Sequence, residues 1–89
     1  MNVRFEARFS KDLLRIKNGK LLKRIKELIF FCKEAENLSA VRQVKKLKGY
    51  DTFFRVRIGD YRIGLEFVDN ELIFVRCLHR KEIYRYFPR

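Results

Sequence analysis

The chain opens with a segment in which apolar and polar residues alternate. The apolar positions are Val3, Phe5, Ala7 and Phe9, and Arg4, Glu6 and Arg8 lie between them. A strict period of two predicts a strand over residues 3–9 with one buried face and one solvent-facing side. Ser10 is then a suitable N-cap for a short apolar helix, and Asn18-Gly19 supplies the left-handed residues that end it.

The period changes to three and four in the next segment. Apolar residues recur at Leu21, Ile25, Leu28, Ile29 and Cys32, and the other side carries Lys20, Lys23, Arg24, Lys26 and Lys33. This pattern predicts a longer amphipathic helix that forms an antiparallel hairpin with the first helix. Residues 34–50 show weaker periodicity, which is typical of a connector with one extra helical turn.

The last 40 residues predict a three-stranded meander. Alternation through residues 54–58 ends at Gly59-Asp60, a second strand covers residues 61–68, and Asp69-Asn70 marks the turn into a third strand at residues 72–78. The predicted fold class is therefore α+β: an N-terminal strand, a helical hairpin, the meander and a short C-terminal helix. One sheet with the helices packed on one face is the economical arrangement for this order.

Register arguments gather arginines on one face of the meander. A two-residue loop at Gly59-Asp60 sets Arg57 opposite Arg62 and Arg55 opposite Gly64. At the second turn, the apolar pattern selects a three-residue loop. That loop sets Ile63 against Cys77 and Gly64 against Arg76, and it places Leu65 and Val75 under the helices. One face is then dry. The other is cationic, with Gly64 leaving room for a substrate, unless the arginines are simply solvated and partly paired with Glu66.

Composition points to an anionic partner. The 22 Lys and Arg residues against 11 Asp and Glu residues leave a net charge of +11 on 89 residues, with a pI near 10.1. A chain of this length predicts a single domain, residues 1–89. Nucleic acid is favoured over a membrane surface because the chain has neither an apolar run of about 18 residues nor an export-signal pattern. Cys32 and Cys77 lie in apolar stripes without metal-ligand spacing, which favours core positions in a reducing cytoplasm.

The C-terminal half resembles toxins of the RelE/ParE superfamily. The stretches that carry the resemblance are KLKGYDTFFRVRI at 46–58, GDYRIGLEF at 59–67 and LHRKEIYRYF at 78–87. The resemblance implies a toxin of a type II toxin–antitoxin system with a cognate antitoxin as partner. The RelE branch cuts mRNA in the ribosomal A site and the ParE branch poisons DNA gyrase, so membership leaves both activities open, beside a plain nucleic-acid-binding module. Carried over, the RelE-branch residues are Arg55, Arg57, Arg62, Arg80 and Tyr84.

These residues suit RNA cleavage without a metal or another cofactor. RNA carries its own nucleophile, so a catalyst must activate a 2′-hydroxyl, stabilise the charged transition state and protonate the departing 5′-oxygen. Arg62 and Arg80 would hold the phosphate, and Arg55 and Arg57 would extend the clamp. Arginine does not act as a base, so proton transfer falls to Tyr84, His79 or Glu66, with Tyr86 an alternative to Tyr84. Further RNA contacts are expected from Lys45, Lys46, Lys48 and Arg76. The scattered acids and the single His provide no metal site.

Overall fold

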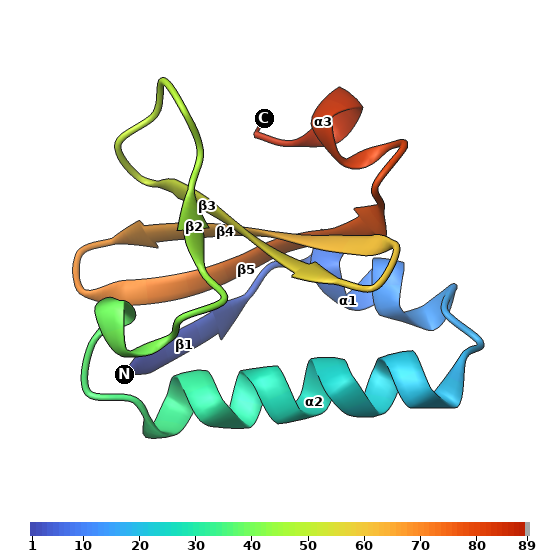
Figure 1. The fold of residues 1–89 in the computed structure, drawn as a ribbon, viewed down its shortest axis with the longest axis horizontal. Coiled ribbons are helices and arrows are strands. Elements are labelled where there is room, and N and C mark those ends of the chain that lie inside the picture. Colours follow the sequence, from blue (N-terminus) through green and yellow to red (C-terminus); the bar gives the residue numbers. More distant parts are fainter. Residues whose placement is uncertain (89) are drawn as a thin grey trace.

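The computed structural model describes residues 1–88 and contains one five-stranded sheet with helices packed against it (Figure 1). The strands are β1 (Asn2–Phe5), β2 (Lys45–Lys46), β3 (Phe53–Ile58), β4 (Tyr61–Val68) and β5 (Glu71–His79), and the helical segments are α1 (Ala7–Leu14), α2 (Gly19–Glu34), the 3-10 turn η1 (Leu38–Ala40) and α3 (Ile83–Tyr86). The strand order is β1-β5-β4-β3-β2, with β1 parallel to β5 and the other neighbours antiparallel. The predicted α+β class is confirmed, and β2 adds a short edge strand inside the segment expected to be a connector.

The boundary between the first strand and the first helix differs from the prediction. Strand β1 ends at Phe5, and α1 begins at Ala7 rather than after Ser10. The reason is that Phe9 and Ile16 are buried at helical spacing, so the apparent alternation beyond Phe5 is one edge of a helical stripe. Asn18 does not end α1 in a left-handed conformation. Its side chain instead accepts hydrogen bonds from the backbone of Lys20 and Leu21, as the N-cap of α2.

The main core lies between the helices and one face of the sheet. Helix α2 buries the predicted stripe, and α1 packs along β5 on the same side (Figure 1). The buried residues of this core are Phe9, Ile16, Leu21, Ile25, Leu28, Cys32, Val41, Val56, Ile58, Ile63, Leu65, Leu72, Phe74 and Cys77. Within residues 1–88, no helix combines the length and the apolar composition needed to cross a membrane.

A β-bulge, rather than a longer loop, sets the register between β4 and β5. The turn Asp69-Asn70 has two residues, both with positive φ, and Val68 pairs directly with Glu71. The predicted pairs Ile63–Cys77 and Gly64–Arg76 are confirmed, but they arise because the register shifts between Gly64 and Leu65. The predicted three-residue loop is therefore wrong.

The bulge also reverses the side on which Val75 lies. This residue is unpaired in the ladder and packs with Ile73, Ile83 and Phe87, in a second small core on the opposite face of the sheet. The prediction that Val75 lies under α1 and α2 is wrong, because an extra residue in one strand places two consecutive side chains, Val75 and Arg76, on the same side. Part of the face expected to be cationic is therefore apolar and covered by α3.

Gly64 lies beneath the C-terminal segment and is not an open approach for a substrate. A Cβ atom at this position would lie only 2.7 Å from the ring of Phe87. Phe87 is itself buried and meets the ring of Phe53 edge-on, with centroids 5.5 Å apart. The small residue at position 64 thus allows an aromatic ring to pack directly on the sheet, which corrects the sequence-based interpretation.

Candidate nucleic-acid interface

A basic concavity forms where the middle of β3, the segment after β2 and the C-terminal segment meet. Its basic and phenolic side chains are Lys46, Lys48, Arg55, Arg57, Tyr50 and Tyr84, and Leu47, Phe87 and Pro88 contribute the apolar wall. The hollow has a volume of about 500 Å³ and is open to solvent. We call it the basic hollow. It unites three of the predicted catalytic residues, Arg55, Arg57 and Tyr84, with two of the predicted RNA-binding lysines.

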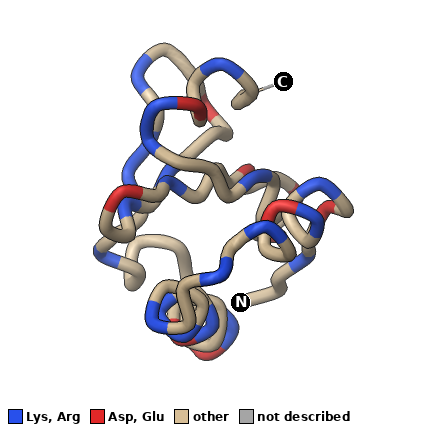
Figure 2. The backbone as a smooth tube through the Cα atoms, turned by 90° about the vertical axis from the view of Figure 1, so that its right-hand side faces the viewer, with Lys and Arg blue, Asp and Glu red and all other residues tan. Residues whose placement is uncertain are grey.

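Cations in the basic hollow are largely uncompensated. Arg55 and Arg57 form no ion pair with any of residues 1–88, and Lys46 reaches Asp51 only at 3.8 Å between exposed side chains. Two neighbouring strands keep the arginines close together, since Arg57 lies opposite Arg62 and Arg55 opposite Gly64. Such a concentration of like charge is costly in the free protein and is relieved by a bound polyanion. Figure 2 shows that basic positions recur throughout the backbone.

Tyr84 faces solvent rather than the core. Tyr84 is 56% exposed on α3, whereas the neighbouring Ile83 is the buried residue of this helix. The alternative that Tyr84 is an ordinary packing residue is therefore wrong. A chain of edge-on ring contacts, Tyr50 to Phe53 at 5.6 Å and Phe53 to Phe87 at 5.5 Å, stiffens the adjoining wall. Tyr84 thus lines the same hollow as Arg55 and Arg57, on a short helix that Ile83 anchors to the second core.

Arg62 and Arg80 lie outside the lining of the basic hollow. The Arg62 guanidinium donates hydrogen bonds to the carbonyl oxygens of Gly59 and Tyr61, both at 2.9 Å. Arg80 approaches the exposed carboxylate of Asp60 at 3.8 Å, and its backbone N–H donates to the Asp60 carbonyl. Both arginines therefore gather around the Gly59-Asp60 turn, one strand away from Arg57, rather than forming the centre of the clamp.

The other proton-transfer candidates are separated from Tyr84. His79 lies with Tyr61 in a different hollow, beside α1, where the two rings meet edge-on at 5.7 Å. Its Nδ1 accepts a hydrogen bond from the Lys81 N–H, as in a structural strand-end histidine. Glu66 lies opposite Phe53 and Ile73 in the sheet, and does not line the basic hollow. Of the four candidates, the structure brings only Tyr84 to Arg55 and Arg57.

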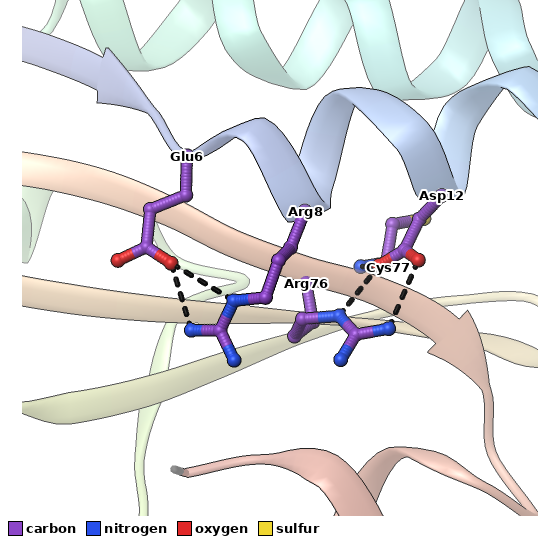
Figure 3. Close-up of polar contacts among 5 residues, drawn as sticks. All are labelled: Glu6, Arg8, Asp12, Arg76 and Cys77. Atoms are coloured by element: carbon purple, nitrogen blue, oxygen red, sulfur yellow. Dashed lines mark hydrogen bonds and ion pairs between the residues drawn. The ribbon is translucent and has the colours of Figure 1, made fainter.

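The partly buried Arg76 is paired with Asp12 of α1 (Figure 3). Its guanidinium donates two hydrogen bonds to the carboxylate of Asp12, at 2.8 and 3.0 Å, and the two side chains are only 15% and 4% exposed. The ring of Tyr86 covers it at 5.6 Å. The hydrogen bonds to Asp12 raise the pKa of Arg76 further. Arg76, predicted to bind RNA, is thus already paired with a carboxylate, and Tyr86, the alternative to Tyr84, packs its ring against the Arg76 guanidinium.

Asp12 also accepts a backbone hydrogen bond at the edge of the sheet. Strand β1 pairs with β5 only as far as Phe74, so beyond this point the backbone of β5 has a neighbouring strand, β4, on one side only. Asp12 fills the gap by accepting a hydrogen bond from the Cys77 N–H at 2.9 Å. Sequence reasoning missed this residue, although an acid three positions after Phe9 and four before Ile16 lies on the buried stripe, where a charge needs a partner.

The remaining candidates from the sequence are Lys45, predicted to bind RNA, and the two cysteines, predicted to lie in the core. Lys45 lies opposite Arg55 in the register but lines a neighbouring hollow with Arg42 and Phe54. Cys32 and Cys77 are free and buried, and burial raises the pKa of these thiols to about 11 and about 12, with the charge of Asp12 adding to the effect at Cys77. In residues 1–88, no three His, Cys, Asp or Glu side chains are grouped as metal ligands.

Comparison with known proteins gives consistent results. The family model for the ParE toxin of type II toxin–antitoxin systems matches residues 3–84. The chain is 45% identical to Toxin RelE3 of Methanocaldococcus jannaschii, over 99% of this chain and 100% of that protein. It is similar to the structure of the RelB-RelE antitoxin–toxin complex from Methanococcus jannaschii, with 43% identity, a TM-score of 0.80 and coverage of 96% and 99%. The RelBE2 toxin–antitoxin complex from Mycobacterium tuberculosis matches with 26% identity, a TM-score of 0.69 and coverage of 89% and 96%.

Proposed function

Because the chain belongs to the ParE toxin family of type II toxin–antitoxin systems, within the RelE/ParE superfamily, we propose that it is a toxin that cuts mRNA, without a metal, in the ribosomal A site. The observation that supports this activity is the basic hollow, which is lined by Arg55 and Arg57, both without an ionic partner among residues 1–88, and by the exposed Tyr84. Phosphate-binding cations next to a group that can transfer a proton are what the cleavage of RNA by its own 2′-hydroxyl requires.

In this mechanism Tyr84 takes part in proton transfer, and Arg55 and Arg57 bind the scissile phosphate. The 2′-oxygen loses its proton and attacks phosphorus, the bond to the 5′-oxygen of the next nucleotide breaks, and that oxygen gains a proton. The products are a 2′,3′-cyclic phosphate and a free 5′-hydroxyl. Negative charge on the phosphate oxygens is greatest in the transition state, so the fixed arginines bind that state more strongly than the substrate.

Arg62 and Arg80 have a supporting role in the proposal. Their present partners are backbone carbonyls and one exposed carboxylate at 3.8 Å, contacts that contribute little to stability. A substrate phosphate near the Gly59-Asp60 turn competes well with them, since charge-assisted pairs with phosphate are stronger. Lys46 and Lys48 extend the cationic lining toward neighbouring phosphates.

The proposed partners are mRNA, the ribosome and a cognate antitoxin, in the cytoplasm where translation takes place. Support for an antitoxin comes from the similar RelB-RelE and RelBE2 structures, each of which is a toxin–antitoxin complex. The net charge of +11 also favours an acidic or amphipathic partner segment over a neutral one.

Product chemistry tests the activity. Purified protein is added to ribosomes translating a defined mRNA, in buffers with and without a chelator that does not strip the ribosome of magnesium. We expect cut sites in the A-site codon with 2′,3′-cyclic phosphate and 5′-hydroxyl ends, and no cut when the attacking 2′-hydroxyl is replaced by hydrogen. Ends carrying a 5′-phosphate would contradict the mechanism.

A ParE-like action on DNA gyrase is the second candidate, favoured by the name of the matching family model. A supercoiling assay with purified gyrase separates the two activities. Stalled gyrase complexes together with intact mRNA would assign the chain to that action instead.

A further inference from the structure

A second groove lies on the other side of Arg57, along the outer edge of β3. Strand β2 pairs with β3 only through Lys45 and Lys46, opposite Arg55 and Phe54, so no strand covers the edge from Val56 onward. Helix α2 and the connector form the far wall of this groove. Its lining includes Arg24, Phe31, Gln43 and Arg57, over an apolar floor of Leu28 and Val56.

The dimensions of this edge groove suit one small ligand group. Its volume is about 330 Å³, at the lower end of the range of roughly 300–1,000 Å³ for small-molecule sites. Arg57 lines both the edge groove and the basic hollow. The edge groove and the basic hollow are therefore adjacent at Arg57, where a chain molecule bound in one can continue into the other.

The side chains of the edge groove are of the types that hold single-stranded nucleic acid. Phe31 is 49% exposed although it is a large apolar residue, and it lines the groove together with the cations Arg24 and Arg57. An aromatic face among cations binds a base by stacking and the backbone by charge. The Gln43 amide can donate to and accept from a base edge. We propose that the edge groove is a subsite for a nucleotide flanking the cleaved phosphate, with its base stacked on Phe31.

Charge supports a nucleotide over a second copy of this chain. Two copies joined at this edge would bring Arg24 and Arg57 of each close to those of the other, without enough acid to balance them. Glu27 is the one acid in the lining. Its carboxylate can accept a hydrogen bond from a ribose hydroxyl or an exocyclic amine, so it is compatible with a nucleoside while the phosphate contacts the arginines. The inference rests on the proposed action on RNA, and assigns a place to the substrate next to the cut.

The test compares two RNA ligands and two neighbouring phenylalanines. The probes are fluorescein-labelled decauridine and the same ribose-phosphate backbone without bases, and binding is measured by fluorescence anisotropy. We expect Phe31→Ala to weaken decauridine binding about tenfold, the loss typical of one stacked base, and to leave binding of the baseless backbone unchanged. Phe30→Ala is the matched control, because Phe30 is 65% exposed on the same helix but does not line the groove.

A second pair of variants tests the phosphate contact. Arg24→Ala should weaken binding of both probes, whereas Lys26→Ala, which removes the same charge from α2 outside the groove, should have a smaller effect. Thermal melts verify that all four variants are folded. Equal decauridine affinities for Phe30→Ala and Phe31→Ala, or no binding by the unmodified protein, would overturn the subsite. If decauridine stacks as expected but translated mRNA is not cut, the proposed function fails, and the edge groove is a nucleotide-binding site without a cleaved phosphate beside it.

Discussion

The arginines at the two ends of one sheet face differ in whether an acid neutralises their charge. At the β5 end, Arg76 is nearly buried, and its charge is neutralised by two hydrogen bonds to Asp12. At the β3 end, Arg55 and Arg57 have no ionic partner among residues 1–88 and line an open hollow. The residue type is the same, and the strands are neighbours of a common strand. What differs is an acid supplied by α1, so the local charge balance separates a structural arginine from one available to a ligand.

The largest expected effect comes from removing that acid. Asp12→Ala leaves the largely buried Arg76 charge without its carboxylate partner and the Cys77 N–H without an acceptor, which should lower the free energy of unfolding by about 3–5 kcal/mol. Chemical denaturation measures the loss. Glu71→Ala is the control, because it breaks the exposed Arg4–Glu71 pair and should cost less than about 1 kcal/mol. Equal losses would remove the distinction between the two kinds of arginine.

At the β3 end we expect the reverse behaviour, a loss of activity with little loss of stability. Arg57→Ala should reduce mRNA cleavage about a hundredfold, since it removes a cation from the site of developing charge. Its melting curve should stay close to that of the unmodified protein, because Arg57 is exposed and unpaired. Arg42→Ala, on the exposed connector, is the matched control for activity. Full cleavage by Arg57→Ala would remove this residue from the site.

Gly64→Ala links the two ends through the C-terminal segment. The added Cβ would lie 2.7 Å from the Phe87 ring, so the ring and α3 must move, at a cost of about 1–3 kcal/mol. We also expect cleavage to fall, because Tyr84 moves with α3. A double variant with Phe87→Leu should recover part of the stability if the clash is the cause. An unchanged melting temperature in Gly64→Ala would show that Phe87 does not pack on the sheet.

The smallest expected effect is a loss of stability in alkali. The unfolded chain releases its thiol protons near pH 8.5, whereas burial holds the pKa of Cys32 at about 11 and that of Cys77 at about 12. Stability is therefore complete well below pH 8.5 and falls as the pH rises toward the folded-state values, by about 1.4 kcal/mol per thiol at pH 9.5. Denaturation at pH 7 and pH 9.5 measures the slope. In the double variant Cys32→Ala and Cys77→Ala the slope should become shallower.

Local sequence patterns were sufficient for the features that depend on near neighbours. The stripe of α2 follows from apolar residues at Leu21, Ile25 and Leu28, and the pairing of Arg57 with Arg62 follows from a two-residue turn. The meander and the α+β class follow in the same way, because a period of two or 3.6 reports which sides of an element are buried. The grouping of Arg55 with Arg57 is equally local, since both lie on one strand.

Only the tertiary structure decided which of these residues lie together. The bulge that turns Val75 away from α1 and α2 interrupts the alternation of side chains between the two faces of the sheet in the middle of β5. No periodic pattern in the sequence indicates this interruption. The pairing of Arg76 with Asp12 joins residues 64 positions apart, and the packing of Phe87 on Gly64 joins two other distant segments. His79 and Tyr84 are close in sequence yet line different hollows, because β5 ends at His79 and the chain then forms α3 on the face of the sheet opposite α1 and α2. The sequence by itself determined the buried stripe of α2 and how much positive charge the chain carries. The tertiary structure decided which charges are neutralised, because that depends on contacts between segments that no local period relates.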